Sequence, residues 1–112
     1  MSIPVALPEL RAATERFAFA YLLTVSDDGR AHVVAVVPEW AIDGGTLSID
    51  DIGRRTAANA TARPGLSLLW PPTSAADYTL IVDGDALVTD DVLTFTPTNA
   101  VLHRPAAPVA SE

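Results

Sequence analysis

Apolar and polar residues alternate along much of this chain, in segments that are separated by turn residues. This two-residue periodicity predicts half-buried strands. Asp-Gly turns at residues 27–29 and 43–45 predict two antiparallel hairpins, and a further turn is expected at Asp90 and Asp91. Gly84 lies inside a long strand pattern, where a bulge or bend is expected. The six predicted strands cover residues 17–26, 30–37, 46–50, 66–70, 77–89 and 92–96.

Two segments have a helical pattern instead. Residues 8–17 begin with a proline and place apolar side chains at helical spacing, which predicts a short amphipathic helix. Residues 51–62 are alanine-rich and lack bulky β-formers until Pro64 and Gly65 end the segment, which predicts a second helix. Strands outnumber helices, so we expect a mostly β fold, a small antiparallel barrel with two short helices.

Length and composition favour one globular domain over residues 1–112, since 49% of the residues are apolar and 19% are charged. Its core is expected over about residues 8–104, and the proline-rich tail over about residues 105–112 is expected to be flexible. The lack of cysteine favours a reducing, cytoplasmic setting, and no apolar run is long enough to predict a membrane span. The net charge of −7 argues against non-specific nucleic-acid binding.

Several kinds of catalytic site are not predicted. No serine stands in a G-x-S-x-G context and there is no cysteine, which argues against nucleophilic hydrolysis. His32 and His103 are far apart in sequence, and neither has a second ligand at helical spacing, so no metal site is expected. The Asp-Gly-Asp segment at residues 83–85 lacks the later ligands of a calcium loop and is interpreted as a solvated bend.

Positive charge is scarce and concentrated. All seven basic residues are arginines, and three of them lie in residues 53–64. Arg54, Arg55 and Thr56 fall in the first turn of the second predicted helix, where free backbone N–H groups and the helix dipole attract anions. Asn59 follows at a spacing that allows it to share a face with them. These residues therefore form a candidate phosphate site.

The same arginines also allow a structural interpretation. Asp50 and Asp51 precede Arg54 and Arg55 by four residues, the spacing of ordinary surface salt bridges. The pattern alone does not choose between the two. Arg63, at the far end of the helix, is interpreted as structural because a cation there complements the negative end of the dipole.

His32 and Trp70 have structural interpretations beside functional ones. His32 shares a strand face with Val34 and Val36, and a single strand histidine is typically a partly exposed structural residue. Trp70 closes an apolar strand, which indicates a core or interface position.

Taken in order, three segments resemble the flavin-binding split-barrel family typified by pyridoxamine 5'-phosphate oxidase. They are YLLTVSDDGRAHVVAVV, then GRRTAANATARPGLSLLWPP after a strand, then DYTLIVDGDA, and the match covers about residues 8–104. The resemblance implies a homodimer of six-stranded antiparallel Greek-key split barrels, with FMN or a deazaflavin held in a cleft between the subunits.

The resemblance also implies a set of cofactor-binding residues. The segment at the helix start would hold the cofactor phosphate, the strand matching the family's GRPH motif would run beside the isoalloxazine ring, and the tryptophan would lie on the strand next to the cleft. These residues are Arg54, Arg55, Thr56, Asn59, His32, Val33, Val34 and Trp70.

The resemblance implies an oxidoreductase that transfers hydride with a small-molecule substrate, and no catalytic residue is assigned. The longer oxidases carry a C-terminal segment that grips pyridoxal phosphate, and this sequence ends soon after AVLHRP, so oxidation of pyridoxamine phosphate itself is not expected. Two alternatives remain: a non-catalytic dimer that stores or senses a flavin or haem, and a structural dimer without a cofactor.

Overall fold

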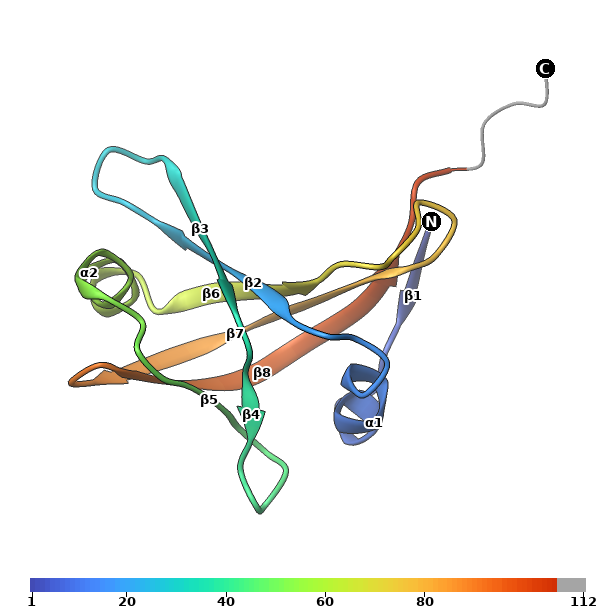
Figure 1. The fold of residues 1–112 in the computed structure, drawn as a ribbon, viewed down its shortest axis with the longest axis horizontal. Helices are drawn as coiled ribbons and strands as arrows, with labels where there is room; N and C mark the ends of the chain where they lie inside the picture. Colours follow the sequence, from blue (N-terminus) through green and yellow to red (C-terminus); the bar gives the residue numbers. More distant parts are fainter. Residues whose placement is uncertain (107–112) are drawn as a thin grey trace.

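The computed structural model describes residues 1–106 and contains eight strands, two α-helices and one 3-10 turn (Figure 1). Most of the described chain is extended, in agreement with the predicted mostly β class. The elements in chain order are β1 Ser2–Pro4, the 3-10 turn Leu7–Glu9, α1 Leu10–Thr14, β2 Ala20–Val25, β3 Ala31–Val36, β4 Glu39–Trp40, β5 Leu47–Ile49, α2 Arg54–Ala62, β6 Gly65–Trp70, β7 Thr79–Thr89 and β8 Val92–His103.

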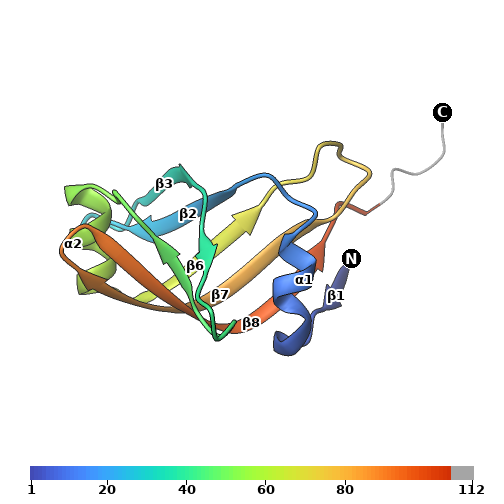
Figure 2. The ribbon, with the colours of Figure 1, turned by 60° about the horizontal axis from the view of Figure 1, so that its bottom comes forward.

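All strand pairs are antiparallel, and the sheet order is β3-β2-β6-β7-β8-β5-β4, with β1 paired to the second half of β8. The sheet curls into a half-barrel. Its two end strands, β3 and β4, follow each other in the chain through Val37 and Pro38 and cross in front of the sheet as one extended segment (Figure 1). The helices α1 and α2 lie at opposite ends of the sheet (Figure 2).

The six predicted strands correspond to β2, β3, β5, β6, β7 and β8. The predicted number of six was wrong, because β1 and β4 add two further pairings. With three and two residues, these strands are too short to produce a periodic pattern. Within residues 1–106 no hydrogen-bonded strand pair joins β3 to β4, the two end strands of the sheet. They are connected only through the chain, by Val37 and Pro38.

The last strand is longer than predicted, because β8 continues through Pro97 to His103. Pro97 lies opposite Gly84, where the β7–β8 register shifts, and β8 has no other partner there because β5 and β1 pair with residues on either side. The bulge expected at Gly84 is confirmed. A Cβ atom on Gly84 would meet the Thr96 carbonyl oxygen and would lie 2.6 Å from Phe95 Cζ, so glycine lets the two strands approach closely.

Both helices are shorter than predicted. Residues 8–17 form the 3-10 turn and then α1, which ends at Thr14, whose hydroxyl donates to the Arg11 carbonyl and accepts from Trp40 Nε1. The second helix begins at Arg54 rather than near Asp51, because Asp51 and Gly53 have φ angles of 53° and 81°, outside the helical region.

The core lies inside the curl of the sheet. Alternate residues of β2, β6, β7 and β8 point into it and are fully buried. The largest are Phe95, Leu22, Leu68, Leu80, Leu93 and Val82. In residues 1–106 no helix is long and apolar enough to cross a membrane. The tail predicted to be flexible falls mostly on residues 107–112, which lie outside the described part.

Candidate functional site

The start of α2 is fixed by the turn between β7 and β8. The backbone N–H of Ile52 donates to the Asp91 carbonyl at 3.2 Å, and the N–H of Gly53 donates to Asp91 Oδ1 at 3.1 Å. Ile52 is buried, which anchors the segment to the core. Gly53 precedes the helix with its positive φ, so the chain turns sharply from β5 into the first turn.

This first turn carries a group of hydrogen-bond donors. Its first backbone N–H groups lack partners within the helix, as in any α-helix, and no side chain in residues 1–106 caps them. Arg54 and Arg55 are exposed, and the salt bridges that their spacing from Asp50 and Asp51 allows are not formed in residues 1–106. Because guanidinium groups and helix N-terminal amides both bind oxyanions, the turn can hold a phosphate.

Thr56 and Asn59 are buried, in contrast to the exposed Arg54 and Arg55. Thr56 is 1% exposed and Asn59 is 6% exposed. Asn59 Nδ2 donates to Thr24 Oγ1 of β2 at 3.1 Å, and Thr24 is itself buried. His32 of β3 lies opposite Thr24 in the pairing of β2 with β3 and is half-buried. The structure therefore joins Asn59 and Thr24 by a buried hydrogen bond and places His32 next to Thr24 on the neighbouring strand.

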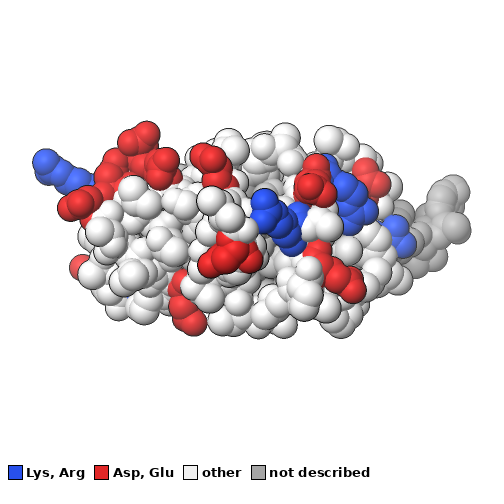
Figure 3. Space-filling view, turned by 90° about the horizontal axis from the view of Figure 1, so that it is seen from below, with Lys and Arg blue, Asp and Glu red and all other residues white. Residues whose placement is uncertain are grey.

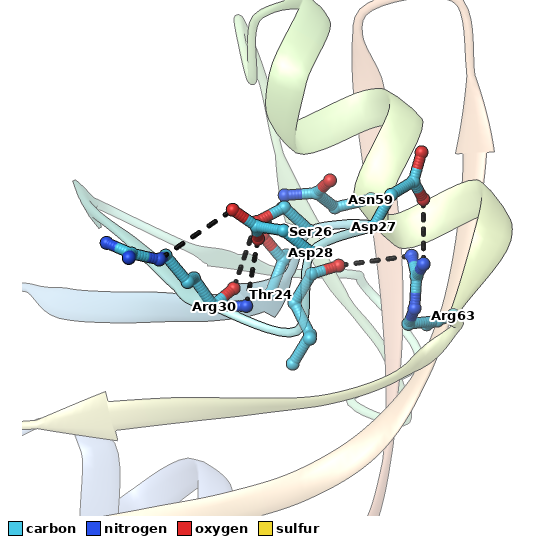
Figure 4. A network of polar contacts seen from close by, with 8 residues as sticks. Thr24, Ser26, Asp27, Asp28, Arg30, Asn59 and Arg63 are labelled. Carbon is cyan, nitrogen blue, oxygen red and sulfur yellow. Dashed lines mark hydrogen bonds and ion pairs between the residues drawn. The ribbon is translucent and has the colours of Figure 1, made fainter.

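A polar network ties the other end of α2 to the β2–β3 hairpin (Figure 4). Arg63 Nη2 donates to Asp27 Oδ1 at 2.7 Å, and Nη1 donates to the Val25 carbonyl at 3.2 Å. Arg63 is therefore structural, as expected, although its partners are hairpin atoms. In the hairpin, the backbone N–H of Arg30 and then the Ser26 hydroxyl hold the pKa of Asp28 below its ordinary value.

The strand β3 has an exposed outer face and, within residues 1–106, an edge without a partner strand. Its residues alternate, so Val34 packs against the core while Val33 is 50% exposed on the outer face. Within residues 1–106, β3 pairs along one edge, with β2, and its other edge has no partner strand. A planar ligand with alternating donors and acceptors can bind along such an edge.

A groove of about 390 Å³ lies beside the end of β3 and the end of β5. Apolar walls and three acidic side chains line it: Phe19, Ala35, Val36, Val37, Ile49, Glu39, Asp50 and Asp51. The chain leaves this groove at Asp51 and reaches Arg54 through Ile52 and Gly53, so the two are close in sequence, although neither Arg54 nor Arg55 lines the groove. The sequence analysis assigned none of these groove residues to the site. The feature that indicates them is the position of Ala31–Val36 at the edge of the sheet, which is known only from the topology.

Trp70 lies in the core at 3% exposure, at the end of β6 and paired with Leu80. This is the core position that the apolar strand pattern indicated. It does not line the groove described above.

Acidic residues outnumber basic ones, 14 to 7, in the sequence. Figure 3 shows acidic side chains spread over one face of the molecule, with arginines in small separate patches among them. No group of three or more histidine, aspartate or glutamate side chains in residues 1–106 is arranged to hold a metal ion.

The fold matches solved structures along nearly its whole length. An F420 reductase superposes with a TM-score of 0.65 at 18% identity, covering 80% of this chain and 94% of the reductase. A protein of the pyridoxinephosphate oxidase family from Clostridium acetobutylicum gives 0.66 at 15% identity, covering 88% and 87%. HutZ, a heme storage protein from Vibrio cholerae, gives 0.54 at 17% identity, covering 82% and 88%. The chain therefore shares the fold of these solved structures, an antiparallel sheet that curls into a split barrel.

A nearer relationship is visible in sequence. The chain is 42% identical over 118 aligned positions to uncharacterized proteins of Mycobacterium bovis and Mycobacterium tuberculosis, covering 93% of this chain and 83% of each relative. It belongs to the same family as these mycobacterial proteins. No family model matches the chain.

Proposed function

We propose that this protein is an oxidoreductase that binds FMN or a deazaflavin and exchanges hydride with a small substrate. The observation that carries the proposal is the first turn of α2, which follows Asp51, a lining residue of the groove of about 390 Å³, through Ile52 and Gly53. This turn combines free helix amides with two arginines that have no carboxylate within 4 Å in residues 1–106. The F420 reductase of the same fold adds support, because its name states a deazaflavin.

The residues of the turn fit a phosphate group. Arg54 and Arg55 supply charged donors, and the backbone N–H groups of the first turn point along the helix axis toward the same region. A Cβ atom on Gly53 would meet nothing within 4 Å, so the space in front of the turn is open. In this proposal Thr56 and Asn59 hold the helix in place from its buried side.

The groove of about 390 Å³ fits the flat ring system of a flavin. Val36, Val37 and Ile49 provide apolar walls, and the free edge of β3 provides backbone donors and acceptors for the polar edge of the ring. A bound flavin supplies the hydride chemistry, while the protein supplies position, electrostatics and exclusion of water.

The proposal includes a homodimer with the cofactor cleft between its subunits. The outer face of the β3-β2-β6 side carries exposed apolar residues that a monomer does not cover. They include Val33, Val25 at 42% exposure and Tyr21 at 36% exposure, and Val37 at 70% exposure lies at the corner beside the groove. An exposed apolar surface of this kind is typical of a protein interface.

Equilibrium titration of the purified protein with FMN and with a deazaflavin, followed by absorption and fluorescence, tests the proposal. Arg54→Gln with Arg55→Gln is expected to weaken flavin binding by at least about tenfold, because charge-assisted hydrogen bonds to the phosphate are lost. Arg11→Gln with Arg30→Gln is the matched control, since it removes the same charge from exposed positions away from the groove.

Two results would count against the proposal. One is the absence of flavin binding below about 1 mM, where the binding free energy is only about 4 kcal/mol. The other is an equal loss of affinity in both double variants, which would make the effect one of net charge. A bound flavin or haem that neither a nicotinamide nor a small reductant reduces would support storage or sensing instead of catalysis.

A further inference from the structure

A second, larger groove of about 760 Å³ lies at the end of the sheet opposite α2. We infer that it binds a planar aromatic acid. That this acid is the substrate of the enzyme rests on the proposed function. The residues on which the inference depends are Arg16, Phe19, Tyr21, Asp77 and Tyr78.

Aromatic side chains form the walls of this larger groove. Phe19 and Tyr21, at the start of β2, pack edge to face with ring centroids 5.2 Å apart and an interplanar angle of 80°. Pairs of this geometry leave ring faces available for another ring. The volume lies in the range of small-molecule sites, which are mostly apolar with a few polar groups.

The opposite wall is held in place by the end of the chain that the structure describes. The guanidinium of Arg104 lies 4.7 Å from the centre of the Tyr78 ring, and its Nη1 donates to the Ala76 carbonyl. The Tyr78 hydroxyl donates to the Met1 sulfur. These contacts fix the loop between β6 and β7, so the groove has a wall before any ligand arrives.

The two charged residues of the groove indicate a ligand with a single carboxylate. Arg16 is exposed, lines the groove, and has no carboxylate within 4 Å in residues 1–106. Asp77 lines the same groove and does not neutralise Arg16. A single carboxylate on the ligand can therefore pair with Arg16, while the carboxylate of Asp77 disfavours a second negative group and accepts from a ligand donor.

Phe19 connects the two grooves, because its side chain lines both. The two grooves therefore meet at Phe19, and the first turn of α2 follows the smaller groove along the chain. In the proposed function this arrangement would place the ring of the cofactor in the smaller groove and the substrate in the larger one.

The test uses 2-naphthoate as the probe and neutral 2-naphthamide as its partner, with dissociation constants measured by calorimetry and ligand-observed NMR. Arg16→Gln is expected to weaken 2-naphthoate binding by about fivefold or more while changing 2-naphthamide binding by less than about twofold. Arg11→Gln, which changes an exposed arginine of α1 that lines neither groove, is expected to change neither. Tyr78→Ala is expected to weaken both ligands, because it removes an aromatic wall of the groove.

Several outcomes would overturn the inference. They are equal effects of Arg16→Gln and Arg11→Gln, no effect of Arg16→Gln on 2-naphthoate, and failure of 2-naphthoate to bind the wild type. Flavin titration of Arg16→Gln separates this inference from the proposed function: flavin that binds the variant normally leaves that function standing, and a wild type that binds no flavin removes it.

Discussion

The buried pair of Thr24 and Asn59 sets a quantitative test of how α2 is attached to the sheet. Thr24→Val removes one hydroxyl with little change of shape, and the Asn59 amide then loses the acceptor that lies 3.1 Å away. Leaving a buried donor unpaired costs about 1–3 kcal/mol of unfolding free energy. Asn59→Leu leaves the Thr24 hydroxyl unpaired instead, and its cost is reduced by about 0.5 kcal/mol because leucine is the better helix former.

The double variant is the informative one. Thr24→Val with Asn59→Leu replaces the hydrogen-bonded pair by an apolar contact, so we expect its loss of stability to be smaller than the sum of the single losses by about 1 kcal/mol or more. Urea denaturation at constant m-value measures the three free energies, and each 1 kcal/mol corresponds to a shift in Tm of about 4–8 °C. Single losses that add within about 0.5 kcal/mol would refute the argument, because independent sites behave in that way.

The same variants also separate two roles for Asn59. The resemblance implied that this side chain contacts the cofactor, whereas its hydrogen bond to Thr24 supports a structural role. If the role is structural, the double variant binds FMN with the affinity of the wild type. A loss of FMN affinity in a well-folded double variant would support a contact between Asn59 and the cofactor instead.

Three further predictions concern the sheet, the hairpin and pH. Gly84→Ala is expected to lower the free energy of unfolding in urea by more than about 2 kcal/mol, because its Cβ would collide with the neighbouring strand. Gly65→Ala is the control: a Cβ there meets nothing within 4 Å, so the free energy of unfolding is expected to change by less than about 1 kcal/mol. Arg63→Gln is expected to cost less than about 1 kcal/mol and to reduce the salt dependence of Tm, as exposed ion pairs do. The pKa of Asp28 is lowered in the folded state, first by the hydrogen bond from the Arg30 backbone N–H. Asp28 therefore contributes stability above its unfolded-state pKa, and this contribution is lost as pH falls through its folded-state pKa. Asp28→Asn should flatten the dependence of Tm on pH below about pH 4.

Most of the sheet was predictable because its signals are local. The turns at residues 27–29, 43–45 and 90–91 each join two strands in the structure, and the glycine at position 84 is at the register shift. The short strands β1 and β4 were missed because three and two residues produce no periodic pattern, and β1 in addition pairs with β8 at the other end of the chain. The extension of β8 was missed because a proline is normally excluded from a strand interior; Pro97 is tolerated because in residues 1–106 no strand pairs with it on one side.

The candidate site was predictable only in part. Helical spacing placed Arg54, Arg55, Thr56 and Asn59 near one another, but spacing alone does not say which side of a helix is buried. The contact with Thr24 of β2 decides that, and it is a tertiary contact. The groove residues Phe19, Val37 and Asp51 come from three separate segments that only the curl of the sheet brings together.

The charge distribution constrains how this chain could hold an anionic cofactor. The net charge of −7 repels anions at long range, and Glu39, Asp50 and Asp51 line the groove itself. Because that repulsion is screened beyond about 8 Å at physiological ionic strength, attraction must come from groups in direct contact with the anion. Arg54 and Arg55 are the contacts available at the first turn of α2, and they carry no carboxylate partner in residues 1–106. An acidic groove that leads to two free arginines therefore favours a ligand that is neutral at its ring and anionic at one end.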